Sequence, residues 1–349
     1  MISGRTEMKL KFTLVALTFA MAPQAFAQAV NYPQMNLRLA HFGPKVFVQS
    51  GIDQWWADEI KKRSGGKINI RIFWGGSAGQ PLEILGLVGS GAVDFGAVPQ
   101  AYFPNELPLI GAPNSVPYVF KTPKAAVAVS AGLVAENKAV QEELRRNKVK
   151  PLFFHPMNPY YPLCTKPVKV MADFKGLKIR SFGAYQPPMW DALGSVGVNV
   201  LPSDIYEGLQ RGRLDCGFFS ADLYKVTKLY EVAKHLSTAG VGPVATWPIW
   251  VNYDKWESSY PAEVKKLITE VSEEAAERSM RAIAEAEAEA LDFLKKQGVA
   301  VVDFAEPDAY HAAIPDMREV WLKSMVSKGL GEQAKTVLDY WRAKQAEIE

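Results

Sequence analysis

Two strand-like segments decide the fold expected for this chain: Asp173-Phe174-Lys175-Gly176-Leu177-Lys178-Ile179-Arg180 and Leu214-Asp215-Cys216-Gly217-Phe218-Phe219-Ser220. A helix-like run from Ser203 to Gln210 lies between them. The first strand ends on an arginine, and the second ends on two aromatic residues and a serine. Ligands of open α/β sheets lie at the carboxyl ends of such strands. We therefore expect a ligand site where these two segments end.

Arg180 is the residue expected to hold the ligand. Its guanidinium stays positively charged, and its planar fork can form two parallel hydrogen bonds with one carboxylate. In the alternative interpretation, Arg180 forms an ion pair with Asp215 or another acid on a solvated rim. The first interpretation predicts that the ligand is an organic acid.

Residues 1–27 have the pattern of a secretory signal peptide. Lys9 and Lys11 flank the start of an apolar run, and Ala25-Phe26-Ala27 fits cleavage before Gln28. The apolar run is shorter than the roughly 20 residues that a membrane span needs, which argues against an uncleaved anchor. We expect a soluble protein that is exported to the periplasm.

The charge of the expected mature chain argues against a nucleic-acid partner. Residues 1–27 contain three basic residues and one acidic residue, so their removal lowers the formal net charge from +3 to +1. Nucleic-acid binding depends on clustered Lys and Arg side chains that neutralise phosphates. The basic clusters at 61–63 and 145–146 lie beside acids on helix-like runs, so we interpret them as solvated helix faces.

The two cysteines, Cys164 and Cys216, leave two possibilities open. An oxidising compartment permits a disulfide between them. Both lie in apolar, strand-like surroundings, where a free cysteine usually behaves as a small buried hydrophobe, and we favour this second possibility. The sequence has no Cys-x-x-Cys or His-Glu-x-x-His spacing, so we expect neither a metal site nor another cofactor.

The order of the predicted elements favours an α/β fold. Strands and helices alternate from residue 36 to 98 and again from 160 to 220, which is typical of parallel, helix-covered sheets. The strand predicted at 247–252 could return to the first of these units. No helix breaker occurs from 262 to 297, and a helix of this length, about 55 Å, can run along two lobes. Its apolar residues keep no strict heptad, which argues against a coiled coil.

The chain resembles the periplasmic solute-binding proteins of TRAP (tripartite ATP-independent periplasmic) transporters over essentially all of its length after residue 27. The most specific matches are residues 173–180, the pattern Ser-Asp-Ile-Tyr-x-x-Leu-Gln-x-Gly-x-x-Asp at 203–215, and residues 66–68 and 90–94. The resemblance implies a two-lobed periplasmic binding protein fold, with strands crossing between the lobes and a long spine helix along both. We expect lobe I at 28–156 plus about 245–285, and lobe II at 157–244 plus about 286–349, including the terminal helices.

The resemblance also implies a function, which is to bind an organic acid outside the cytoplasm and deliver it to a TRAP membrane permease for ion-driven uptake. Its carboxylate clamp falls on Arg180. Some acid-sugar binders have a second arginine where Tyr160 stands and an asparagine where Phe219 stands. Members that hold a metal have a glutamate in a segment where this chain has Phe218-Phe219, so neither a metal nor a polyhydroxylated acid is favoured.

These differences predict an aromatic or apolar monocarboxylate as the ligand. The residues expected to bind it besides Arg180 are aromatic and amide side chains: Tyr160, Phe219, Phe42, Gln100, Gln80 and Trp247. For each aromatic residue, ordinary core packing is the alternative.

Two other functions are alternatives to transport. Gly75-Gly76-Ser77-Ala78-Gly79 matches the Gly-x-Ser-x-Gly turn of serine hydrolases, but no histidine lies in a recognisable motif and only two strands precede Ser77. We therefore expect that the protein is not an enzyme. A ligand-sensing partner of a receptor would use the same closing cleft, and the sequence does not separate it from a transport protein.

Overall fold

The computed structural model describes residues 1–4 and 30–349. The predicted signal peptide lies almost wholly outside the described residues, so its cleavage stays a prediction. Residues Tyr32–Glu349 form one compact unit. Among the described residues, no helix combines the length and the apolar character that a bilayer crossing requires.

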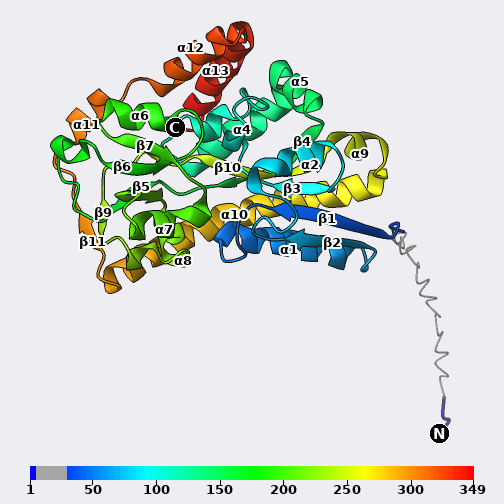
Figure 1. Cartoon of the computed structure of the whole chain (residues 1–349). Helices are drawn as coiled ribbons and strands as arrows, with labels where there is room; N and C mark the ends of the chain where they lie inside the picture. Colours follow the sequence, from blue (N-terminus) through cyan, green and yellow to red (C-terminus); the bar gives the residue numbers. More distant parts are fainter. Residues whose placement is uncertain (5–29) are drawn as a thin grey trace. The chain divides into compact units, whose positions relative to one another are not determined.

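The first sheet of this unit has five strands in the order β2-β1-β3-β10-β4 (Figure 1). Their bounds are Met35–His41 (β1), Ile68–Phe73 (β2), Phe95–Ala97 (β3), Val149–Pro156 (β4) and Ala245–Asn252 (β10). Strand β1 is parallel to β2 and β3, whereas β10 is antiparallel to β3 and β4. The strand predicted at 247–252 therefore does return to the first sheet.

The helices packed with this sheet make up what we call the first lobe. Their bounds are Val48–Arg63 (α1), Ile84–Gly89 (α2), Ala112–Ser115 (α3), Pro123–Glu136 (α4), Lys138–Arg146 (α5) and Tyr253–Ser258 (α9). Helix α1 ends before Gly65 and Gly66, which both have positive φ, as is common where a helix terminates. The break between α4 and α5 falls at Asn137, whose side chain accepts a hydrogen bond from the Val140 amide and so caps α5.

The second sheet has six strands in the order β11-β9-β5-β8-β6-β7. Their bounds are Tyr161–Cys164 (β5), Lys178–Ser181 (β6), Val196–Asn199 (β7), Cys216–Phe219 (β8), His235–Ser237 (β9) and Ala300–Val302 (β11). With helices Gln186–Ala192 (α6), Ile205–Gln210 (α7) and Ala221–Val226 (α8), it makes up the second lobe. Strand β6 pairs in parallel with β8, so the two segments that decided the expected fold are neighbours.

Cys164 and Cys216 form a disulfide. The favoured prediction, that both cysteines are free, is therefore wrong. The two residues lie directly opposite each other in the antiparallel pair of β5 and β8, with their Cα atoms 4.0 Å apart. This register depends on long-range strand pairing, which the local apolar pattern around each cysteine does not reveal.

Two of the chain segments that cross between the lobes lie side by side, one after β4 and one before β10. They are hydrogen-bonded to each other, because the Met157 amide donates to the Val244 carbonyl and the Val241 amide donates to the Tyr160 carbonyl, both at 3.1 Å. We call this pair of segments the crossover. Gly242, with φ +76°, lies so close to the Phe120 carbonyl that an added Cβ would be 2.6 Å from its oxygen.

The long helix α10, Ala262–Lys296, has 35 residues and is about 52 Å long. It packs against α1 and β4 of the first lobe and against α8 of the second (Figure 1). The Trp56 indole of α1 donates a hydrogen bond to Ser272 of α10 at 3.0 Å. The predicted α/β two-lobed fold with a spine helix is thus confirmed.

The chain ends in three helices, Pro307–Ala313 (α11), Met317–Ser327 (α12) and Gly331–Ala346 (α13). Helix α11 packs on the second lobe, where the rings of Tyr310 and Phe174 are 5.7 Å apart. Helix α13 packs against α4 and α5, and Trp321 of α12 donates a hydrogen bond to the Pro108 carbonyl at 3.1 Å. The boundaries given for the lobes stay a prediction. That prediction placed the terminal helices in lobe II, whereas α12 and α13 contact segments that it assigned to lobe I.

Candidate ligand-binding site

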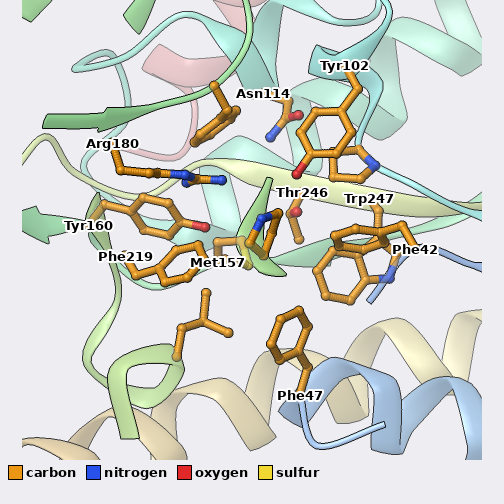
Figure 2. A pocket seen from close by; sticks show the side chains of 14 residues that line it. Phe42, Phe47, Tyr102, Asn114, Met157, Tyr160, Arg180, Phe219, Thr246 and Trp247 are labelled. Carbon is orange, nitrogen blue, oxygen red and sulfur yellow. The ribbon is translucent and has the colours of Figure 1, made fainter. Parts of the chain in front are cut away.

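A buried pocket lies where residues of both lobes and of the crossover meet (Figure 2). Half of its 14 lining residues are aromatic: Phe42, Phe47, Tyr102, Tyr160, Phe182, Phe219 and Trp247. The polar or charged ones besides the tyrosines are Arg180, Asn114 and Thr246. The free space among these side chains is about 30 Å³, which holds about two water molecules. A larger ligand enters only when the lobes separate or the side chains turn.

Arg180 projects from β6 into this pocket and is 2% exposed. Two main-chain carbonyls fix it, because Nη1 donates to Phe218 at 3.2 Å and Nε donates to Val200 at 3.4 Å. Within residues 30–349, no carboxylate forms an ion pair with it. Asp215 instead accepts a hydrogen bond from the Lys178 amide at 2.8 Å, so the alternative of an Arg180–Asp215 pair is not what the structure has.

Aromatic groups surround the guanidinium of Arg180. Its central carbon lies 4.8 Å from the ring centre of Phe182 and 4.7 Å from that of Phe219, which are cation–π distances. Burying a cation is costly unless an anion or hydrogen-bond acceptors compensate it. The rings hold the guanidinium in place but supply no negative charge, so the pocket favours an anionic ligand.

Two tyrosines place hydroxyl groups beside Arg180. Burial raises the pKa of Tyr102, and the neighbouring Arg180 charge only partly offsets this. Burial likewise raises the pKa of Tyr160. Both hydroxyls therefore stay protonated at neutral pH and can donate hydrogen bonds to a carboxylate.

The opposite wall is formed by Trp247 of β10 and Phe42, whose rings are 4.8 Å apart in an edge-to-face arrangement (Figure 2). Phe47, at the start of α1, packs beside them with its ring centre 6.4 Å from that of Trp247. These groups come from the first lobe, whereas Arg180 and Phe219 come from the second. A ligand between the two walls would thus contact both lobes.

A fully buried polar network holds this wall from behind. Asp53 of α1 accepts hydrogen bonds from Trp247 Nε1 at 3.2 Å, His41 Nε2 at 2.9 Å and His155 Nε2 at 2.8 Å. His155 Nδ1 in turn lies 2.7 Å from Ser279 Oγ of α10. Burial acts to raise the pKa of Asp53, but the charge of His155 and the hydrogen bonds of both histidines outweigh it and hold the pKa well below its usual range.

Five of the seven residues expected to bind ligand line the pocket: Arg180, Tyr160, Phe219, Phe42 and Trp247. The other two do not. Gln80 lines an outer crevice between residues 42–47 and 201–206. Gln100 is fully buried but outside the pocket, and neither end of its amide has a hydrogen-bond partner in the described structure.

Several pocket residues were missed by the sequence analysis, among them Tyr102, Asn114 and Phe47. Tyr102 and Asn114 come from the proline-punctuated stretch 99–123, where no regular period indicates which side chains face inward. The Asp53 network was missed as well. Its one sequence signal is that His41 directly precedes the predicted ligand residue Phe42.

The described residues do not support the hydrolase alternative. Ser77 is exposed, and the hydrogen bonds of the described histidine rings go to other residues. No group of three or more His, Cys, Asp or Glu side chains in residues 1–4 and 30–349 is arranged to hold a metal ion.

Two α/β lobes joined by a crossover, with a buried arginine between them, define a solute-binding protein. The chain belongs to the bacterial extracellular solute-binding protein family 7, whose model matches residues 40–328. This is a family of solute-binding proteins rather than enzymes. The resemblance to TRAP solute-binding proteins seen in the sequence is thereby confirmed.

Individual relatives are distant in sequence and close in fold. The 2,3-diketo-L-gulonate-binding periplasmic protein YiaO of Escherichia coli is 23% identical over 276 residues, 77% of this chain and 81% of YiaO. A TRAP periplasmic solute binding protein from Desulfovibrio salexigens, solved with orotic acid, has a TM-score of 0.78 at 21% identity and covers 90% of this chain and 99% of its own. The Bordetella pertussis extracytoplasmic solute receptor DctP7, solved with pyroglutamic acid, has a TM-score of 0.76 at 21% identity, with coverages of 88% and 99%.

Proposed function

We propose that this protein binds a small organic acid in the periplasm and delivers it to a TRAP membrane permease for ion-driven uptake. Arg180 binds the carboxylate of the acid. The observation that carries the proposal is the burial of Arg180 between two aromatic rings, with no carboxylate of the described chain paired to it. A carboxylate ligand would compensate this charge with two parallel hydrogen bonds.

The ligands of similar proteins support an acid. Orotic acid, pyroglutamic acid and galacturonate, which were found in three of the structures with this fold, all have a carboxyl group. The lining of this pocket favours an aromatic or apolar monocarboxylate, because half of the lining residues are aromatic.

Binding proceeds by hinged closure. In the open form the carboxylate meets Arg180 on the second lobe, and closing brings Phe42 and Trp247 of the first lobe onto the rest of the ligand. Closing also removes water from around the ion pair, which strengthens it. Domain closure around a ligand by a few bending residues is a common device.

A thermal-shift screen with matched pairs of acids and amides tests this function. Benzoate and phenylacetate should raise the melting temperature in proportion to the logarithm of their concentration above the dissociation constant. Benzamide and phenylacetamide have the same rings without the charge and should leave it unchanged. Equal stabilisation by acids and amides, or stabilisation only by neutral sugars or peptides, would overturn the proposal.

A further inference from the structure

A second cavity of about 260 Å³ adjoins the Arg180 pocket. The two spaces share two aromatic side chains, Tyr102 and Phe182, which form a partition between them. The second cavity is lined from the first lobe by Leu82, Ala101 and Pro104 and from the second lobe by residues 181–183 and 199–201. It is several times larger than the free space beside Arg180 itself.

Strand β6 also borders both the Arg180 pocket and the second cavity. Adjacent residues of a strand point to opposite faces, and on β6 Arg180 faces the first pocket while Ser181 faces the second cavity. The Ser181 hydroxyl is fully buried and has no hydrogen-bond partner in the described structure. The carbonyl that accepts from Arg180 Nε belongs to Val200, whose side chain also lines the second cavity.

We infer that the second cavity receives the apolar tail of the acid whose carboxylate is bound by Arg180. The inference rests on the proposed function and narrows it to monocarboxylates with an extended alkyl or arylalkyl tail. A turn of the Phe182 or Tyr102 ring opens the partition for this tail. The tail then lies between walls from both lobes, so each added apolar group also favours the closed form.

The outer crevice that contains Gln80 is the competing route. It shares Phe42, Phe47 and Pro202 with the Arg180 pocket, but no residue that contacts the guanidinium. Phe182, in contrast, both touches Arg180 and lines the second cavity, which places this cavity nearer to a bound carboxylate.

The test is calorimetry with linear alkanoates from butanoate to octanoate. In the wild-type protein, affinity should rise about fourfold for each methylene that enters the second cavity, until the cavity is full. Leu82→Trp and Asn199→Trp reduce the cavity from opposite lobes, and neither residue contacts Arg180. Both should remove most of the gain for hexanoate and octanoate and leave the affinity for butanoate within about twofold of wild type. Leu82 is 61% exposed, so its replacement puts folding at little risk.

Ser203→Trp is the matched control, because it adds the same side chain to the outer crevice. It should preserve the full rise in affinity with chain length. Two results would overturn the second cavity as the tail site. The first is a wild-type affinity that does not change with alkanoate chain length. The second is a loss of the gain for hexanoate and octanoate in Ser203→Trp but not in the other two variants. Failure of the proposed function has a different signature, in which Arg180→Ala binds every alkanoate as tightly as wild type.

Discussion

The indole nitrogen of Trp247 donates a hydrogen bond to the Asp53 carboxylate at 3.2 Å. Through this bond, one wall of the pocket is anchored to helix α1, and His155 extends the anchor to Ser279 of the spine helix. The network is fully buried, so water cannot replace a lost partner. The stability of the first lobe and the position of Trp247 therefore depend on the same carboxylate.

The Asp53→Asn variant should lower the free energy of unfolding by about 1–3 kcal/mol, the usual cost of leaving a buried hydrogen-bonding group without its partner. Urea denaturation measures this loss. The control is Glu270→Gln, which removes an exposed i,i+4 ion pair with Lys266 and should cost less than about 1 kcal/mol. Similar small losses in both variants would show that the Asp53 network contributes little.

The Arg180→Ala variant should weaken binding of a benzoate or phenylacetate ligand by tens to thousands of fold. Loss of one partner of a buried charge pair costs about 2–5 kcal/mol, and each 1.4 kcal/mol is tenfold in affinity. Arg180→Lys keeps the charge but loses the planar fork, so its affinity should be intermediate.

Titration calorimetry measures these affinities. Arg213→Ala, which removes an exposed arginine of the same lobe, serves as the control and should bind like wild type. The Arg180→Ala protein without ligand should still melt in one cooperative transition, because Arg180 has no ion pair to lose within the described residues. An affinity unchanged by Arg180→Ala would contradict the proposed clamp.

Glu287 of α10 should make stability depend on pH between about 4.5 and 8. Burial, together with the nearby Asp222 carboxylate, raises the pKa of Glu287 from 4.5 to about 8. Between these values the folded state keeps a proton that the unfolded state has lost, so the free energy of unfolding should fall as the pH rises. Above pH 8 this contribution stops changing.

The Glu287→Gln variant should remove this pH dependence, because the glutamine side chain stays neutral in both states. Thermal melts at half-unit steps from pH 5 to 8.5 measure the effect. Glu285→Gln, at an exposed position of the same helix, should keep the wild-type slope. A wild-type slope in Glu287→Gln as well would assign the dependence to another group.

The Cys164–Cys216 disulfide should stabilise the second lobe. It closes a loop with a sequence separation of 52 residues, for which the chain-entropy relation gives about 4 kcal/mol. Reduction with dithiothreitol should therefore lower the urea midpoint of the wild-type protein. The double variant Cys164→Ser/Cys216→Ser should start from the lower midpoint and be insensitive to dithiothreitol. Equal midpoints for oxidised and reduced protein would contradict this prediction.

Local patterns in the sequence were sufficient for the framework of the fold. The stretch without a helix breaker after Pro261 became α10, and the strands ending at Arg180 and Phe219 are in the predicted lobe. Arg180 could be singled out because strand ends and the chemistry of guanidinium groups point to the same residue. These features depend on neighbours along the chain, which the sequence displays directly.

The features that were missed depend on contacts between distant segments. The disulfide needs the register of β5 against β8, and the Asp53 network joins α1, β1, β4, β10 and α10. Helix α13 packs on α4 and α5 although the intervening chain passes through the second lobe. Gln100 was expected to bind the ligand, but the short helical turn that begins at this residue buries it outside the pocket.

The crossover also forms part of the pocket. Four pocket residues lie on the crossover or next to it: Met157, Tyr160, Thr246 and Trp247. A ligand bound in this pocket would therefore contact the same segments about which the two lobes would hinge. Rotation of one lobe away from the other would displace these side chains from the ligand, so domain opening and ligand release would be a single step. A permease that separates the two lobes would thereby release the ligand, without a separate change at Arg180.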